Sequence, residues 1–359
     1  MGGRAARRFA ASTIALAVLL ATTTTPGAHA RAGRSRAAAG ATFAAPADTD
    51  SSAVAELQRE AARLAPLVRT PWVRAFLAAT AQLPHVATRA VYTDSARTRW
   101  WTAGEAGTLP DSTRARLVRR ELDEGFYYDT RYGSPLAYAR PLDLLAAAGV
   151  RDPRGLRLCD FGYGTVGHLR LLASLGADVT GIEVDPLLPA LYSAPADTGA
   201  IGGGHVRLVS GHWPGDADVA AAVGGGYDVF VSKNTLKNGY IHPERPTDPR
   251  RLVHLGVDDT TFVAAVARIV KPGGWAVIYN LSPAPAPPDK PYIPWADGRC
   301  PFPSGLWRAH GFDVVDFDRV DDAAARAMGH ALGWDQGAGA MDLAHDLFAH
   351  VTLLRRRAR

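Results

Sequence analysis

The stretch Asp160-Phe161-Gly162-Tyr163-Gly164-Thr165-Val166-Gly167 decides the fold. Its first two residues end an apolar run, Leu156–Phe161, which predicts a buried β-strand, and a helix is predicted directly after it over 168–175. A turn between such elements bends sharply and brings its backbone close to a ligand. Glycine permits both, because it has no Cβ and adopts positive φ freely. The helix that follows offers unpaired N–H groups and the positive end of its dipole.

An acidic residue stands at the matching position of the next strand. Glu183 ends the predicted strand Val179–Glu183 and lies 21 residues after Gly162. In a parallel sheet this end of the strand lies beside the glycine turn, at the edge where such sheets bind ligands. A carboxylate there accepts hydrogen bonds from both hydroxyls of a ribose. The turn and the acid together predict a ligand that contains a nucleoside.

Strands and helices alternate from this point to the C-terminus. Further strands are predicted at 206–209, 227–232, 275–279, 312–317 and 348–354, and an amphipathic helix at 259–270 precedes the turn Lys271-Pro272-Gly273-Gly274. Regular alternation predicts a Rossmann-like α/β fold, with a seven-stranded, mostly parallel sheet and helices on both faces. We expect the last two strands to form an antiparallel pair, although 321–332 has a helical pattern.

Residues 134–359 resemble the class I S-adenosylmethionine-dependent methyltransferases at three places. Residues 160–164 are similar to the first motif of that family, 179–186 to its second strand with the ribose acid, and 271–274 to its turn before the fifth strand. The resemblance implies that S-adenosyl-L-methionine is the cofactor. It implies a cofactor site formed by Asp160, Gly162, Tyr163, Gly164, Gly167, Glu183, His212, Trp213 and Ser232.

The chain departs from this family at two positions. The third glycine of the family usually comes two residues after the second, where this chain has Val166, so Gly167 would take that role in a wider turn. After the third strand the family often has an acid that binds the adenine amino group, and this chain has His212 and Trp213. His212 or a backbone carbonyl would then contact the adenine, and Trp213 would pack against its face.

Catalytic residues are harder to predict than the residues of the cofactor site. Methyl transfer from a sulfonium is an in-line displacement that mainly requires alignment, and a base is needed only if the nucleophile must lose a proton. The candidates follow the fourth strand: Lys233, Asn234 and His242 are suited to an acidic or polar acceptor, and a solvated loop is the alternative. Amino methylators of the family often have Asn-Pro-Pro-Tyr or Asp-Pro-Pro-Tyr at this place, and this chain does not. We predict a small-molecule acceptor and do not predict amino methylation.

The N-terminal part has a different organisation. Residues 1–30 have a basic start, the apolar stretch Phe9–Ala21 and the exit Ala28-His29-Ala30, which is the pattern of a secretory signal peptide. The apolar stretch is shorter than the roughly 20 residues that span a bilayer, so no stable anchor is expected after cleavage. Residues 31–50 are predicted to be a disordered linker. The following region, 51–133, is predicted to be helical, with helices near 54–68, 73–83 and 111–124.

This pattern predicts a secreted or extracytoplasmic protein. S-adenosylmethionine is an intracellular metabolite, however, so a cytoplasmic location is the alternative. The formal net charge is +5, and three of the basic residues, Arg4, Arg7 and Arg8, lie in the first 30 positions, which hold no acid. The remaining chain is close to neutral, which gives no reason to predict a nucleic-acid partner.

The chain has two cysteines, at positions 159 and 300. Cys159 lies in a predicted buried strand, so it and Cys300 are expected to be unpaired thiols, and their spacing predicts no metal site.

A G-x-G-x-x-G turn also fits an NAD(P)-dependent oxidoreductase. Asp160 argues against that function, because dinucleotide folds usually have an apolar residue there. A secreted, non-catalytic binding protein on the same scaffold is the other alternative.

Overall fold

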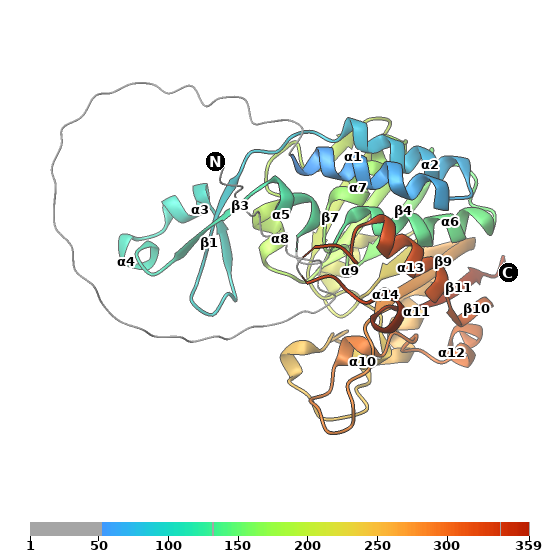
Figure 1. Ribbon diagram of the computed structural model, residues 1–359. Helices are drawn as coiled ribbons and strands as arrows, with labels where there is room; N and C mark the ends of the chain where they lie inside the picture. The colour runs from blue at the N-terminus through green and yellow to red at the C-terminus, as the bar shows by residue number, and fades with distance from the viewer. Residues whose placement is uncertain (1–51, 131–132, 338, 359) are drawn as a thin grey trace.

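The computed structural model describes residues 52–130, 133–337 and 339–358. They form an α/β body around an eight-stranded sheet, with a small three-stranded sheet projecting from one side (Figure 1). The predicted signal peptide and linker, 1–50, lie outside the described residues. Within the described ranges no helix has both the length and the apolar character needed to cross a membrane.

The main sheet has the strand order β10-β11-β9-β8-β4-β5-β7-β6. Strands β7, β5, β4, β8 and β9 pair in parallel, whereas β11 is antiparallel to both β9 and β10. The strands are β4 (Arg157–Phe161), β5 (Asp178–Glu183), β6 (Gly199–Ile201), β7 (Gly204–Ser210), β8 (Tyr227–Lys233), β9 (Val270–Ser282), β10 (Phe312–Val320) and β11 (Phe348–Arg356).

The predicted Rossmann-like sheet and its antiparallel C-terminal pair are confirmed. The sheet has eight strands rather than seven, because β6 adds a short antiparallel edge to β7. The expected turn 271–274 lies inside β9. There the pairing with β8 shifts between Tyr227 and Val229, and the four residues bulge out of the ladder around Gly273, whose φ is 79°.

Helices cover both faces of this sheet and bury two separate apolar cores. Side chains of a strand alternate between the faces, so Val229 and Val231 of β8 enter one core and Phe230 enters the other. The first core is covered by α1 (Ala53–Leu64), α2 (Pro71–Ala78), α6 (Ala139–Ala147), α7 (Gly167–Ser174), α8 (Leu187–Leu191) and α13 (Asp322–Ala331). The second is covered by α9 (Ala217–Val223), α11 (Asp259–Ile269) and α12 (Ser304–Ala309).

The two cysteines lie in the second of these cores. Cys159 and Cys300 are both buried and free, which confirms the expectation of unpaired thiols.

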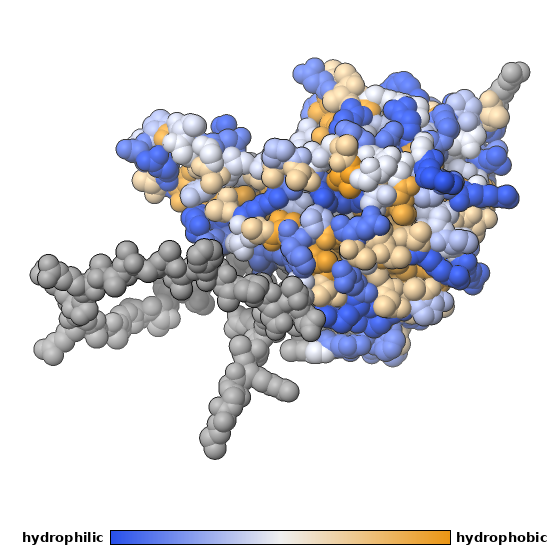
Figure 2. Space-filling view, turned by 90° about the horizontal axis from the view of Figure 1, so that it is seen from above, coloured by the Kyte–Doolittle hydropathy of each residue, from blue (hydrophilic) through white to orange (hydrophobic). Residues whose placement is uncertain are grey.

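Seen from above, the body shows polar and apolar residues interspersed over its surface, and the small sheet extends away from it (Figure 2).

The projecting sheet corrects the prediction for residues 85–124. Its strands are β1 (Arg89–Thr93), β2 (Trp100–Thr102) and β3 (Val118–Leu122), antiparallel in the order β2-β1-β3. The helix predicted over 111–124 is wrong, because only α4 (Asp111–Arg114) is helical before β3 begins. Almost all of β3 is exposed, so its sequence has no buried apolar alternation that would mark it as a strand. Between β2 and α4 lies α3 (Ala103–Thr108), and α5 (Glu124–Asp129) follows β3.

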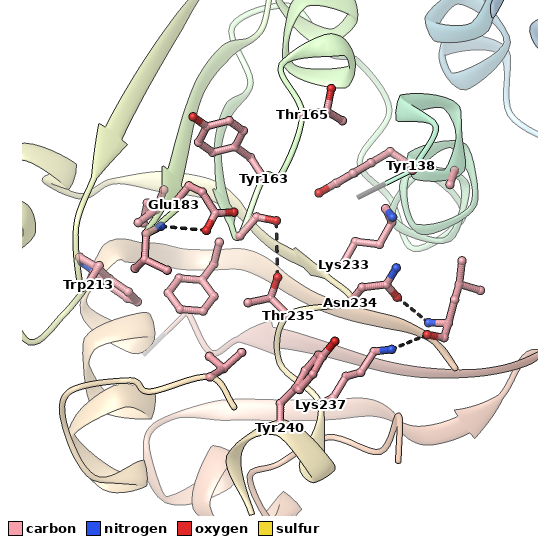
Figure 3. A pocket seen from close by; sticks show the side chains of 18 of the residues that line it. Tyr138, Tyr163, Thr165, Glu183, Trp213, Lys233, Asn234, Thr235, Lys237 and Tyr240 are labelled. Carbon is pink, nitrogen blue, oxygen red and sulfur yellow. Dashed lines mark hydrogen bonds between the residues drawn. The ribbon is translucent and has the colours of Figure 1, made fainter. Parts of the chain in front are cut away.

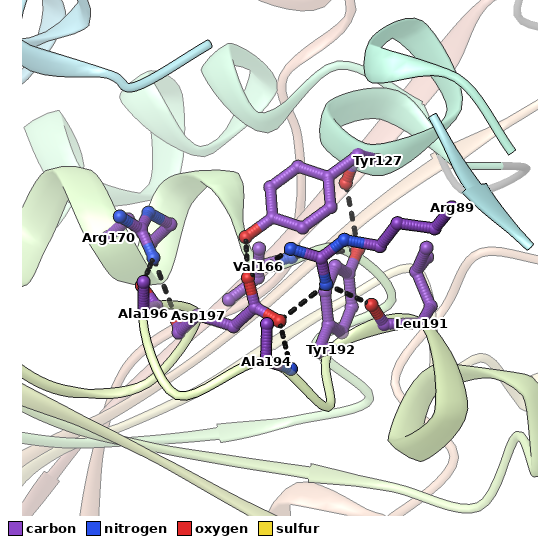
Figure 4. Close-up of polar contacts among 9 residues, drawn as sticks. All are labelled: Arg89, Tyr127, Val166, Arg170, Leu191, Tyr192, Ala194, Ala196 and Asp197. Atoms are coloured by element: carbon purple, nitrogen blue, oxygen red, sulfur yellow. Dashed lines mark hydrogen bonds and ion pairs between the residues drawn. The ribbon is translucent and has the colours of Figure 1, made fainter. Parts of the chain in front are cut away.

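Arg89 ties the small sheet to the body. Its guanidinium pairs with the Asp197 carboxylate, with 2.7 Å between Nη2 and Oδ1, and also donates to the Leu191 carbonyl (Figure 4). The Tyr127 hydroxyl donates to the same carboxylate at 2.9 Å. Tyr192 continues the network, since its hydroxyl donates to the Tyr127 carbonyl at 2.9 Å and accepts the Val166 N–H at 3.3 Å. The network therefore reaches Val166, the residue directly before α7 at the end of the glycine turn.

Replacing Arg89 with alanine tests this attachment. Asp197 has a side chain that is 3% exposed, so Arg89→Ala leaves a buried carboxylate without its cation. We expect the free energy of unfolding, measured with urea, to fall by about 3 kcal/mol. Arg114→Ala removes a pair whose side chains are 46% and 92% exposed, and it should leave the urea midpoint unchanged. Equal effects of the two substitutions would show that the network does not stabilise the fold.

Candidate functional site

A cavity of about 340 Å³ opens where β4, β5, β7 and β8 end. This is the edge at which parallel α/β sheets bind ligands, and the volume lies within the range of small-molecule sites. Its wall includes seven residues predicted from the sequence: Gly162, Tyr163, Glu183, His212, Trp213, Lys233 and Asn234. Figure 3 shows Glu183 and Trp213 on one side of the cavity and Lys233, Asn234 and Lys237 on the other.

The glycine turn forms part of the cavity wall. Gly162 and Gly164 have φ angles of 79° and 60°, in the left-handed region that glycine enters at no steric cost. Gly162 is also required by a close contact, because a Cβ at this position would lie 2.0 Å from the Thr235 Oγ1. The Gly162 N–H donates to the Ile182 carbonyl at 2.9 Å, which holds the turn against β5.

Glu183 connects this turn to the end of β5. Its Oε1 accepts the backbone N–H groups of Val184 at 2.8 Å and Asp185 at 3.3 Å, and its Oε2 accepts the Gly164 N–H at 3.3 Å. Burial raises the pKa of Glu183 to about 7, against the opposing effect of these three donors. The carboxyl group is therefore held in place by backbone on two sides and changes charge near neutral pH.

Asp160, by contrast, lies behind the cavity wall and is fully buried. Its Oδ2 lies 2.5 Å from the Nε2 of His168 on α7, and the Tyr138 ring stacks on the His168 ring with 3.5 Å between centroids. Burial lowers the pKa of His168, although the adjacent carboxylate opposes this effect. The Asp160–His168 contact joins the end of β4 to α7, which are the two elements on either side of the glycine turn.

Four other predicted residues also lie outside the cavity wall. Gly167 begins α7, where a Cβ would lie 2.8 Å from the Pro135 Cβ, so its glycine serves helix packing. Gly164 contributes its N–H to Glu183, and Ser232 is buried on β8. His242 is at the surface, where its Nε2 lies 3.0 Å from the Oδ2 of Asp259.

Trp213 packs mainly against apolar side chains of the second core. It is 2% exposed and belongs to the second core, where its ring meets Phe161 at 6.0 Å and Phe262 at 5.5 Å between centroids. Trp213 also lines the cavity. The neighbouring His212 is exposed, and its backbone N–H donates to Asp216 at 3.1 Å.

The structure adds residues that the sequence analysis did not single out. The principal ones on the cavity wall are Tyr138, Thr235, Lys237, Tyr240, Arg251 and Trp334. Lys237 is 1% exposed, and its ammonium donates to the carbonyls of Leu281 and, at 3.0 Å, Trp295. Lysine is scarce in the sequence, but this marks the exposed Lys271 and Lys290 as much as Lys237. Tyr138 and Trp334 come from segments far from Lys237 in the chain, and the tertiary fold brings them to the same wall.

The strand order decides which α/β fold this is. Counted along the chain without the short β6, the strands lie in the order 3-2-1-4-5-7-6, and the seventh is antiparallel. This is the class I methyltransferase fold. A dinucleotide-binding sheet has the order 3-2-1-4-5-6, so the methyltransferase fold does not favour the NAD(P) alternative.

Comparisons with known proteins give only distant likenesses. No protein-family model and no curated protein matches the chain. Among solved structures, the chain is similar to the [4+2]-cyclase SpnF, with 18% identity, a TM-score of 0.38 and coverage of 61% of this chain and 82% of that one. It is similar to a putative sarcosine dimethylglycine methyltransferase from Galdieria sulphuraria, with 14% identity, a TM-score of 0.38 and coverage of 64% and 88%.

A third similar structure is the magnesium protoporphyrin IX methyltransferase from Synechocystis PCC 6803 with bound SAM. The identity is 18%, the TM-score is 0.33, and the match covers 64% of this chain and 82% of that one.

Two glycine substitutions distinguish the energetic cost of a steric collision at Gly162 from the cost of its positive φ angle. Gly162 and Gly273 have the same φ of 79°, but a Cβ on Gly273 meets nothing within 4 Å. Gly273→Ala should lower the free energy of unfolding by about 1–2 kcal/mol, the cost of the left-handed conformation. Gly162→Ala should lower it by a further 1–3 kcal/mol or so, because the methyl group collides with Thr235. Urea denaturation of both variants measures the difference, and equal losses would mean that the contact with Thr235 is relieved without cost.

Proposed function

We propose that the protein is an S-adenosylmethionine-dependent methyltransferase that acts on a small-molecule acceptor by in-line transfer. The main support is the Glu183 carboxyl group on the cavity wall, beside a turn that only glycine can form without strain. In its charged form this carboxylate, at the end of β5, accepts hydrogen bonds and so suits the two hydroxyl donors of a ribose. The motif resemblance and the strand order favour the nucleoside of S-adenosylmethionine over that of NAD(P).

The proposed cofactor site divides the predicted residues into two groups. Gly162, Tyr163, Glu183, His212 and Trp213 line the cavity and would contact the cofactor directly. The remaining members would act from behind the wall, by holding the turn, α7 and the end of β8 in place: Asp160, Gly164, Gly167 and Ser232.

The acceptor would bind at the opposite side of the cavity. When bound, the cofactor supplies a methyl group already activated by its sulfonium, so the protein has to orient the acceptor and exclude water. Lys233 and Asn234, at the end of β8, would orient the acceptor, and the rings of Tyr138, Tyr240 and Trp334 line the same cavity. His242 is outside the cavity and is left out of the proposed acceptor site.

We also propose that residues 1–30 direct export, as the signal-peptide pattern predicts. Mass analysis of the mature chain from the producing cell should find an N-terminus directly after Ala30. An intact N-terminus on active protein would instead support the cytoplasmic alternative, in which S-adenosylmethionine is directly available.

Binding of S-adenosylhomocysteine, the demethylated product, should depend on pH through Glu183. The raised pKa of about 7 means that the group is partly protonated in the free protein at neutral pH. Ribose hydroxyls donate to the charged form, so binding lowers this pKa and the affinity rises with pH. Below pH 7 the affinity should fall by as much as about tenfold per pH unit.

Calorimetric titration from pH 6 to pH 8 measures this dependence. Glu183→Gln should bind more weakly at pH 8 and lose most of the pH dependence, whereas Glu121→Gln, whose side chain is 60% exposed on the small sheet, should behave as the unaltered protein. S-adenosylhomocysteine, but not NADH, should raise the melting temperature. The proposal fails if the protein binds NADH instead, or if Glu183→Gln has no effect.

A further inference from the structure

Lysine is rare in this chain, and its distribution is uneven. The 40 basic residues include four lysines, at 233, 237, 271 and 290. The side chains of Lys271 and Lys290 are 50% and 66% exposed, whereas Lys233 and Lys237 are 7% and 1% exposed and both line the cavity. Burying an ammonium group is costly unless a counter-charge or hydrogen bonds compensate it. Two buried lysines on one wall therefore need an explanation.

The protein itself supplies little counter-charge. Across the described residues neither lysine forms an ion pair, and Lys233 Nζ lies 5.2 Å from the centre of the Tyr138 ring. Asp160 and Asp129 act on Lys233 only as nearby charges, as does Asp297 on Lys237. The Asp160 carboxylate is already bound to His168, and the Asp297 carboxylate to Arg299. Lys237 donates to two backbone carbonyls, which leaves one N–H of its ammonium for another acceptor.

Asn234 turns a third donor towards the same space. Its φ is 66°, a conformation that asparagine tolerates better than most residues. Its Oδ1 accepts the Leu281 N–H at 2.7 Å, so the amide NH₂ must point the other way. Asn234 also lines the cavity, next to Lys233 in Figure 3.

The basic side chains on the cavity wall are Lys233, Lys237 and Arg251, besides His212 and His254, and hydroxyl groups on the wall, such as those of Tyr138 and Thr235, can donate or accept. Glu183 is the one Asp or Glu on the wall within the described ranges, and it lies on the opposite side, bound by three backbone N–H groups. A ligand group between Lys233, Asn234 and Lys237 must therefore accept hydrogen bonds and gains from negative charge.

We infer that the acceptor substrate is an anion whose carboxylate or phosphate group binds between Lys233, Asn234 and Lys237. This inference rests on the proposed function and names the substrate class of the same site. Burial lowers the pKa of Lys233 to about 8, and burial together with the charge of Lys233 lowers that of Lys237 to about 7. A bound anion would favour the protonated form of both amines and offset the repulsion between them. Lysine rather than arginine suits this place, because its charge is compact.

The cofactor offers a second possible source of a carboxylate, in its own amino-acid part. The test therefore uses two pairs of probes. The first pair is benzoate and benzyl alcohol, which share a ring suited to the aromatic wall but differ in charge, titrated into protein saturated with S-adenosylhomocysteine. The second pair is S-adenosylhomocysteine and methylthioadenosine, of which only the first has a carboxylate. Calorimetry measures each dissociation constant for the unaltered protein, Lys233→Gln and Lys290→Gln.

Benzoate should bind about tenfold or more tightly than benzyl alcohol, and inorganic phosphate should compete with it. Lys233→Gln should weaken benzoate by about tenfold and leave benzyl alcohol unchanged, because one charged donor is lost. Lys290→Gln should change none of the four dissociation constants. Both variants should keep the affinity of the unaltered protein for methylthioadenosine, which shows that they are folded.

Two results would overturn the inference while leaving the proposed function intact. One is equal affinity for benzoate and benzyl alcohol. The other is a loss of S-adenosylhomocysteine affinity in Lys233→Gln without a loss for methylthioadenosine, which would assign the cations to the cofactor carboxylate. Failure of both nucleosides to bind the unaltered protein would overturn the proposed function, and this inference with it.

Discussion

The contact between the Glu183 carboxyl group and the backbone of the glycine turn shapes the cavity. Oε2 accepts the Gly164 N–H while Oε1 accepts two N–H groups after β5, so one side chain joins the turn after β4 to the end of its neighbour. Buried polar groups need such partners. The same geometry leaves the carboxyl group on the cavity wall, where a ligand with two hydroxyl donors can reach it.

Contacts outside the cavity wall hold β4, α7 and the glycine turn in position around this contact. The Asp160–His168 pair joins β4 to α7, and Gly167 lets Pro135 pack closely on the same helix. From the other side, the Tyr192 hydroxyl accepts the Val166 N–H and connects the turn to the network around Asp197. Residues that resemble ligand-binding motifs in the sequence thus include several that position the turn without touching the cavity.

The sequence predicts the parts of the structure that are encoded locally. The glycine turn, Glu183 and the sheet follow from spacing and periodicity within short segments. The small sheet was missed because β3 is exposed and has no apolar alternation. Lys237 was missed because its environment comes from Leu281 and Trp295, 44 and 58 residues further along the chain. The position of Asp160 behind the wall depends on His168 and Tyr138, a packing arrangement that no motif states.

A crystal structure with S-adenosylhomocysteine would show whether Glu183 binds a ribose. We expect the nucleoside to occupy the cavity, with both ribose hydroxyls within hydrogen-bond distance of the Glu183 carboxylate and the Gly162 backbone against the ligand. A ligand bound elsewhere, or a ribose that makes no contact with Glu183, would contradict this expectation.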